Sequence, residues 1–116
     1  MLVAEDDAAI RSVLAQALAD EGYAIATAAD GQLALEEYAS FHPDVVVLDL
    51  MMPVLDGIEF LHRRETSCSV PVVVITATYR PQAFAPDLGV AALILKPFDI
   101  RLLLRTLAVV LDGALV

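Results

Sequence analysis

Short apolar runs alternate with amphipathic segments along most of this chain. Five runs are rich in apolar and β-branched side chains, at residues 2–4, 24–26, 45–48, 72–75 and 92–95. Runs of this length predict strands, and the central runs lack polar alternation, which is typical of strands covered on both faces. The pattern therefore predicts a parallel sheet between two layers of helices.

The segments between these runs have helical spacing. In the first segment, five apolar residues fall at i, i+3, i+4, i+7 and i+8, namely Ile10, Val13, Leu14, Ala17 and Leu18. They predict one buried helix face, with Asp7 as the N-cap and Gly22 as the stop. The first helix should therefore lie between these two residues.

Caps and breakers predict three further helices. The ranges are 31–40 after Asp30, about 57–65, and 100–112 after Asp99. In the last range, the predicted buried residues are Leu103, Leu104, Leu107 and Leu111. Between residues 78 and 89 two prolines, Pro81 and Pro86, predict a short or irregular helix.

A strand and helix alternation of this kind predicts a doubly wound α/β fold with right-handed crossovers. A length of 116 residues matches one domain, which we expect to span residues 1–116. The first strand begins almost at Met1, so the natural chain is expected to extend further upstream.

The charge balance narrows the range of functions. Seven basic and 16 acidic side chains give a formal net charge of −9 at pH 7. A surface of this sign repels nucleic-acid phosphates and anionic membranes, so we expect neither as a direct partner. The single cysteine, Cys68, cannot form an internal disulfide. We therefore expect a cytoplasmic protein.

Chemically active side chains follow four of the predicted strands. Glu5 and Asp6 follow the first strand, Asp49 the third, Thr76 the fourth and Lys96 the fifth. The carboxyl ends of parallel strands meet at one edge of a sheet. Carboxylates gathered there repel one another, and without nearby His or Cys they favour Mg²⁺ or another oxygen-seeking cation such as Mn²⁺. Together with a lysine and a hydroxyl, they predict phosphoryl transfer.

Asp49 is the predicted nucleophile of this site. It follows the apolar run 45–48, which should be the central strand. Aspartate carboxylates can form aspartyl-phosphate intermediates.

Four motifs in this order resemble the receiver domain of two-component response regulators. They are the segment 2–7 with its acidic cluster, the segment 48–57 (Leu-Asp-Leu-Met-Met-Pro-Val-Leu-Asp-Gly), Thr76-Ala77, and Lys96-Pro97-Phe98. The resemblance covers essentially the whole chain. It implies a flavodoxin-like (βα)5 fold with a five-stranded parallel sheet in the order 2-1-3-4-5.

The resemblance also implies a role for each site residue. Asp49 would accept a phosphoryl group from the phosphohistidine of a sensor histidine kinase or phosphotransfer protein. Asp6, Asp49 and the backbone carbonyl of Met51 would bind the metal directly, and Glu5 would act through water. Lys96 would pair with the phosphate. The chain would be a signalling switch rather than an enzyme, with an unknown downstream effector.

Two departures from the family pattern concern the switch itself. Thr76 resembles the switch hydroxyl, but Leu93 occupies the position where many receivers have a mobile Tyr or Phe. The segments 49–76 and 76–96 are also a few residues shorter than is usual for the family. We therefore expect activation to run through Thr76 and the backbone after it, without an aromatic rotation. The resemblance further implies a cis peptide between Lys96 and Pro97.

Other polar residues are interpreted as structural. His42 lies beside a proline and His62 on a helix, away from the acidic edge, and Cys68 lies in a loop. Asp7 is a helix cap rather than a ligand. Gly57 is expected to supply a positive φ.

Alternatives stay open at this point. A degenerate receiver would bind a partner without being phosphorylated. An aspartate-nucleophile phosphatase is disfavoured because Met51 stands where a D-x-D motif has its acid. A nucleotide-binding domain is disfavoured because acidic residues replace the glycines of a phosphate-binding turn. A homodimer, and the choice between a stand-alone regulator and a domain of a larger protein, are also left open.

Overall fold

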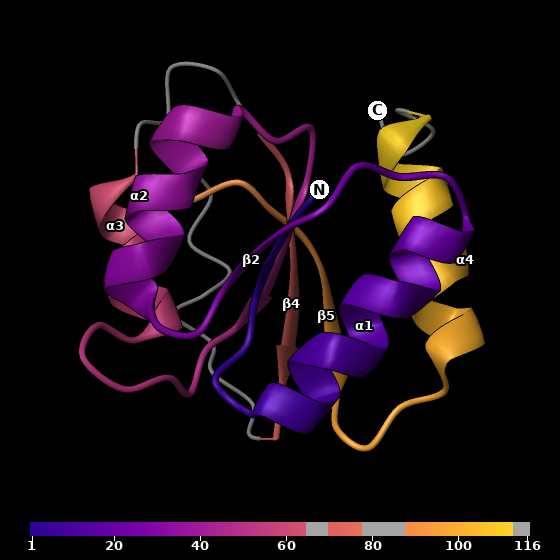
Figure 1. Cartoon of the computed structure of the whole chain (residues 1–116), viewed down its shortest axis with the longest axis horizontal. Coiled ribbons are helices and arrows are strands. Elements are labelled where there is room, and N and C mark those ends of the chain that lie inside the picture. Colours follow the sequence, from indigo (N-terminus) through magenta and orange to yellow (C-terminus); the bar gives the residue numbers. More distant parts are fainter. Residues whose placement is uncertain (65–69, 78–87, 113–116) are drawn as a thin grey trace.

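The structure, a computed structural model, describes residues 1–64, 70–77 and 88–112. Strands and helices alternate along it (Figure 1). In chain order the elements are β1 (Leu2–Ala4), α1 (Ala8–Asp20), β2 (Ala26–Ala28), α2 (Gly31–Phe41), β3 (Val46–Asp49), α3 (Gly57–Arg63), β4 (Val72–Thr76), β5 (Val90–Leu95) and α4 (Ile100–Leu111). The irregular helix predicted between residues 78 and 89 lies almost entirely outside the described residues.

The five strands form one parallel sheet in the order β2-β1-β3-β4-β5. This confirms the predicted fold class and strand order. β3 lies at the centre, and all four of its residues are buried. Asp49, its last residue, pairs in register with Ile75 of β4. The central strand therefore ends in the predicted nucleophile.

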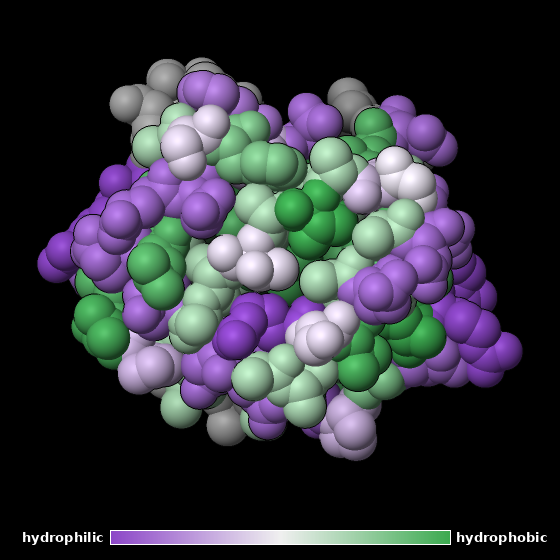
Figure 2. Space-filling view, in the orientation of Figure 1, coloured by the Kyte–Doolittle hydropathy of each residue, from purple (hydrophilic) through white to green (hydrophobic). Residues whose placement is uncertain are grey.

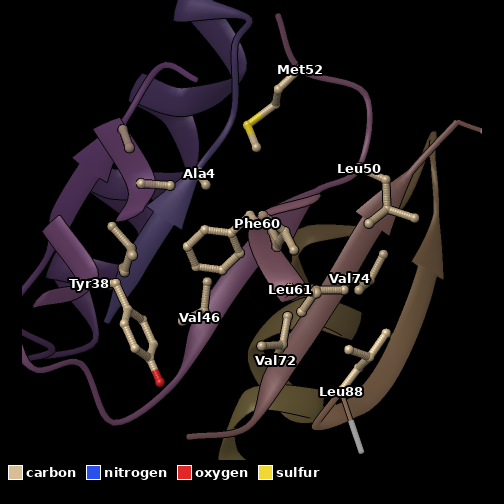
Figure 3. Packing of buried hydrophobic residues seen from close by; sticks show 14 residues of the cluster. Ala4, Tyr38, Val46, Leu50, Met52, Phe60, Leu61, Val72, Val74 and Leu88 are labelled. Atoms are coloured by element: carbon tan, nitrogen blue, oxygen red, sulfur yellow. The ribbon is translucent and has the colours of Figure 1, made fainter. Parts of the chain in front are cut away.

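Helices cover both faces of the sheet, with α2 and α3 on one side and α1 and α4 on the other (Figure 1). Where α2 and α3 pack against the sheet, the fully buried Phe60 of α3 contacts the Tyr38 ring of α2 edge-to-face, with ring centroids 5.9 Å apart (Figure 3). Figure 2 shows polar residues over both flanks and hydrophobic residues gathered between the helix layers. The amphipathic helices thus turn their apolar faces to the sheet.

An aspartate caps each helix of the described chain by accepting hydrogen bonds from backbone N–H groups of its first turn. These caps are Asp7, Asp30, Asp56 and Asp99. A cap of this type satisfies donors that have no partner within the helix. The caps predicted at Asp7, Asp30 and Asp99 are confirmed, and Asp56 adds one that was not predicted.

Several predicted boundaries and faces were wrong. β2 begins at Ala26 rather than residue 24, because Ala26 is the residue that pairs with Leu2 at the start of β1. In α1, Val13 is 63% exposed. In α4, Val110 is buried while Leu111 is exposed, because the buried residues 103, 107 and 110 follow the helical period.

The predicted cis peptide between Lys96 and Pro97 is present.

The loop after β3 differs from the prediction at Gly57. The positive φ of this loop belongs to Val54 (φ 67°), and Gly57 is not among the residues with positive φ. Gly57 is required for space instead: a Cβ there would lie 2.6 Å from Leu50 Cα and 2.7 Å from Asp49 O. α3 therefore begins in direct contact with the end of β3.

None of the helices in the described ranges is both long enough and apolar enough to cross a bilayer.

Candidate functional site

The predicted site residues gather at the carboxyl edge of the sheet, which is the lower edge in Figure 1. Asp49 and Thr76 are the last residues of β3 and β4, Glu5 and Asp6 directly follow β1, and Lys96 directly follows β5. Since all strands run parallel, the topology brings these five residues to one edge.

Three carboxylates form a compact cluster. Glu5, Asp6 and Asp49 each place an oxygen within 4.8 Å of the other two. Glu5 and Asp49 are buried, whereas Asp6 is exposed. Such a set of hard oxygen donors, open on one side, fits Mg²⁺, which keeps several waters and takes few protein ligands. The donor chemistry therefore fits the metal that the sequence predicts.

Lys96 bridges two of these carboxylates. Its Nζ lies 2.6 Å from Glu5 Oε1 and 2.9 Å from Asp49 Oδ2. Burial by itself would lower the pKa of Lys96, but the hydrogen bonds to Glu5 and Asp49 outweigh burial and raise it. Lys96 therefore stays charged and offsets part of the negative charge of Glu5 and Asp49.

Glu5 is the most deeply buried member of the cluster. Its side chain is inaccessible to solvent, and burial raises its pKa to about 7, although the hydrogen bond from Lys96 opposes the shift. Oε2 also accepts the Asp7 backbone N–H at 3.2 Å. A second cation at this edge would favour the ionised form of Glu5.

Asp49 is oriented from both sides. Oδ1 accepts the backbone N–H of Met51 at 3.0 Å, while Oδ2 accepts from Lys96. Thr76 is fully buried, and its backbone oxygen accepts the Lys96 N–H at 2.8 Å. The loop carrying the lysine is thus tied directly to the end of β4.

The residues interpreted as bystanders lie elsewhere. His42 ends α2 in a left-handed conformation, and His62 is exposed on α3. Neither belongs to the carboxylate cluster. The prediction for Cys68 lies outside the described residues.

Two arginines were missed by the sequence analysis. Arg11 donates to the backbone of the acidic turn. Arg64, only 5% exposed, donates to the carbonyl oxygens of Val70 and Leu88. Bonds from a side chain to backbone oxygens leave no periodic signal in the sequence. Only the i+4 spacing of Arg11 from the predicted cap Asp7, which places it over the start of its helix, could have suggested its position.

An open, largely apolar pocket of about 580 Å³ lies beside Lys96. Its walls come from the start of α1, from Ala77 after β4 and from the segment after β5, and include Ile10, Val13, Phe98 and Ile100. Apolar surface therefore adjoins the charged site.

A doubly wound parallel α/β domain with an acidic cluster and a lysine at its carboxyl edge has the architecture of a phosphorylation-controlled signalling switch. The sequence profile described as "Response regulator receiver domain" matches residues 1–108. The chain belongs to the response regulator receiver domain family. Receiver domains of this family bind Mg²⁺ through acidic residues, and Glu5, Asp6 and Asp49 form such a group here.

Curated relatives and solved structures agree with this assignment. Response regulator MprA of Mycolicibacterium vanbaalenii is 39% identical, in an alignment that covers 98% of this chain and 53% of the relative. MprA of Mycobacterium ulcerans is also 39% identical, over 96% of this chain and 49% of the relative. The chain thus spans about half the length of these curated relatives.

Two structures are similar over almost the whole fold. The receiver domain of Francisella response regulator 1452 has a TM-score of 0.85 at 29% identity, covering 97% of this chain and 96% of that one. A CheY-like receiver domain protein from Methanospirillum hungatei has a TM-score of 0.89 at 26% identity, covering 97% and 92%.

Proposed function

We propose that residues 1–116 form one receiver domain that takes a phosphoryl group onto Asp49 in a Mg²⁺-dependent reaction. The donor is the phosphohistidine of a sensor histidine kinase or phosphotransfer protein. The observation that carries this proposal is the setting of Asp49, which lies within the three-carboxylate cluster and shares Lys96 with Glu5.

In this reaction an Asp49 oxygen attacks phosphorus, so an O–P bond forms while the P–N bond of the phosphohistidine breaks. The bonding electron pair leaves with the imidazole nitrogen. The Met51 N–H and Lys96 hold the two Asp49 oxygens, so the carboxylate is oriented before the donor arrives. A bound divalent cation would offset the negative charge of the transferring oxygens.

Asp6, Asp49 and the Met51 carbonyl are the proposed direct ligands of that cation, and Glu5 is proposed to act through water. The three carboxylates carry more negative charge than Lys96 can offset, so the edge attracts a cation before any phosphate binds. Once Asp49 is phosphorylated, Lys96 can pair with a phosphoryl oxygen, and the Thr76 hydroxyl can donate to another.

The pocket beside Lys96 supports docking of a protein donor. Its apolar walls, from α1 and the segment after β5, can bury apolar side chains of the donor next to Lys96, which contacts Asp49. The charge of −9 does not favour nucleic acid on this domain. The proposed location of the domain is the cytoplasm, because the proposed phosphodonor and Mg²⁺ are available there.

A switch explains the site better than a turnover enzyme does. Met51, two residues after Asp49, has an exposed side chain that cannot donate a proton to a leaving group. A degenerate receiver that binds partners without phosphorylation is disfavoured because the nucleophile, lysine and acidic cluster are all present and in contact.

Intact-mass measurement after incubation with acetyl phosphate and Mg²⁺ tests the proposal. The wild type should gain one phosphoryl mass, and this gain should disappear with a chelator. Asp49→Asn should gain none, whereas Asp44→Asn, an exposed acidic control, should react like the wild type. An Asp49→Asn protein that still gains the mass would refute Asp49 as acceptor, and an unreactive wild type would favour the degenerate receiver.

A further inference from the structure

Arg11, in α1, contacts the acidic turn that follows β1. Its Nη1 donates to the backbone oxygen of Glu5 at 2.9 Å and to that of Asp6 at 3.4 Å. The side chain therefore folds back over the beginning of its own helix. It belongs to none of the motifs that define the family resemblance, and the proposed phosphoryl transfer does not use it.

The turn that Arg11 contacts carries two of the three clustered carboxylates. The Glu5 N–H donates to Ala28 O at 3.0 Å, and the Asp7 N–H donates to the Glu5 side chain. These bonds fix Glu5 and Asp7 on either side of Asp6. In the middle of the turn, the Arg11 side chain donates to the carbonyl oxygens of both Glu5 and Asp6.

Asp6 depends on its backbone for orientation. Its side chain is exposed, and within the described ranges no hydrogen bond from another residue holds its carboxylate. Glu5 and Asp49 are different, because Lys96 binds both directly. The direction in which the Asp6 side chain leaves the backbone is thus set by the two peptide units on either side of it, and Arg11 donates to the oxygens of both.

We propose that Arg11 is a positioning residue of the metal site, which holds the Glu5 and Asp6 carbonyls and so keeps the Asp6 carboxylate beside Asp49. This inference rests on the proposed Mg²⁺ site. Groups that orient a metal ligand without touching the metal commonly change affinity by a factor of about 10–100 when they are removed.

The positive charge of Arg11 and its positioning role should have opposite effects on the metal affinity of the site. A guanidinium near the site repels a divalent cation, so removal of the charge alone would tighten metal binding. Removal of a positioning group weakens it. The sign of the change in metal affinity therefore separates the two roles. A loss of stability alone would not change the metal affinity of the folded protein.

The experiment measures Mn²⁺ binding to the intact chain from the EPR signal of free Mn²⁺, with Mg²⁺ as competitor. Arg11→Met should weaken Mn²⁺ binding roughly tenfold. Arg11→Lys keeps the charge but offers a compact ammonium, so its affinity should lie between those of the wild type and Arg11→Met. Arg63→Met, which removes an exposed arginine of α3, is the matched control and should bind as the wild type does.

Circular dichroism at the assay temperature ensures that each variant is folded. Unchanged or tighter binding by folded Arg11→Met, or equal weakening in Arg63→Met, would overturn the role of Arg11 and leave the metal site intact. A wild type that binds no Mn²⁺ would overturn the metal site and this proposal with it. If Arg11→Met does not fold, Arg11→Lys decides, and an affinity equal to that of the wild type would contradict the proposal.

Discussion

Lys96 Nζ lies closer to Glu5 Oε1, at 2.6 Å, than to Asp49 Oδ2, at 2.9 Å. The lysine that the sequence assigns to the phosphate is therefore also the partner of a buried glutamate 91 residues away. This pair anchors the loop after β5 to the end of β1. Because Glu5 is fully buried while its pKa is raised, its protonation is linked to folding.

Stability without metal should depend on pH through Glu5. The pKa of Glu5 is about 7 in the folded chain, against an ordinary value of 4.5. Between these values the folded state keeps a proton that the unfolded state releases, so the free energy of unfolding should fall as pH rises from 4.5 to 7. The loss attributable to Glu5 is at most on the order of 3 kcal/mol.

Urea unfolding in the presence of a chelator, at a series of pH values, measures this effect. Other carboxylates titrate in the same range, so the informative quantity is the difference between the wild type and Glu5→Gln. That difference should change between pH 4.5 and 7 and become constant above it. Glu36→Gln, an exposed control, should follow the wild type at every pH. A constant difference for Glu5→Gln would contradict the raised pKa.

Alanine substitutions at Asp6 and Asp7 should affect metal binding and helix capping separately. Asp7 Oδ1 accepts the N–H groups of Ala9 and Ile10 at 2.9 and 3.0 Å, so Asp7→Ala should lower the free energy of unfolding by about 1 kcal/mol. Asp6→Ala should weaken Mg²⁺ binding much more than Asp7→Ala does. Calorimetric titration and thermal unfolding of both variants check this, and equal losses of affinity would count against Asp6 as the direct ligand.

Gly57→Ala should disturb both the fold and the nucleophile. The added Cβ would lie 2.6 Å from Leu50 Cα and 2.7 Å from Asp49 O, which are backbone atoms that cannot yield cheaply. We expect a loss of about 1–3 kcal/mol and slower phosphorylation by acetyl phosphate.

Gly22→Ala is the control for this substitution. Gly22 has φ +94°, and its Cβ would meet nothing within 4 Å. This variant should lose about 1 kcal/mol through its backbone conformation and keep the wild-type phosphorylation rate. Equal phosphorylation rates in Gly57→Ala and Gly22→Ala would show that the close approach at Gly57 does not position Asp49.

Val54→Gly should stabilise the chain. Val54 is 82% exposed and has φ 67°, a conformation that is costly for a β-branched residue and open to glycine. We expect a gain of about 1 kcal/mol in the free energy of unfolding, measured with urea. Val13→Gly, at an exposed position within α1, should lower it instead. A loss of stability in Val54→Gly would contradict the strain.

Much of the fold depends on local features and could be predicted from the sequence. The apolar run around Val46 and Val47 predicts a buried central strand, and capping by Asp7, Asp30 and Asp99 involves backbone groups only two or three residues away. The site residues could be predicted because they come at the ends of apolar runs, and parallel strands present those ends together.

Contacts between one element and another, or between an element and the loop beside it, were decided only by the tertiary structure. The start of β2 follows from its register with β1, the role of Gly57 from the approach of α3 to Asp49, and the contacts of Arg11 from the path of the acidic turn. The burial of Glu5 against Lys96 joins the segments that follow β1 and β5, which are 91 residues apart. The sequence by itself determined which residues have the chemistry for this site. Which of them are buried, which touch and which orient the others depends on strand register and packing, which no local pattern records.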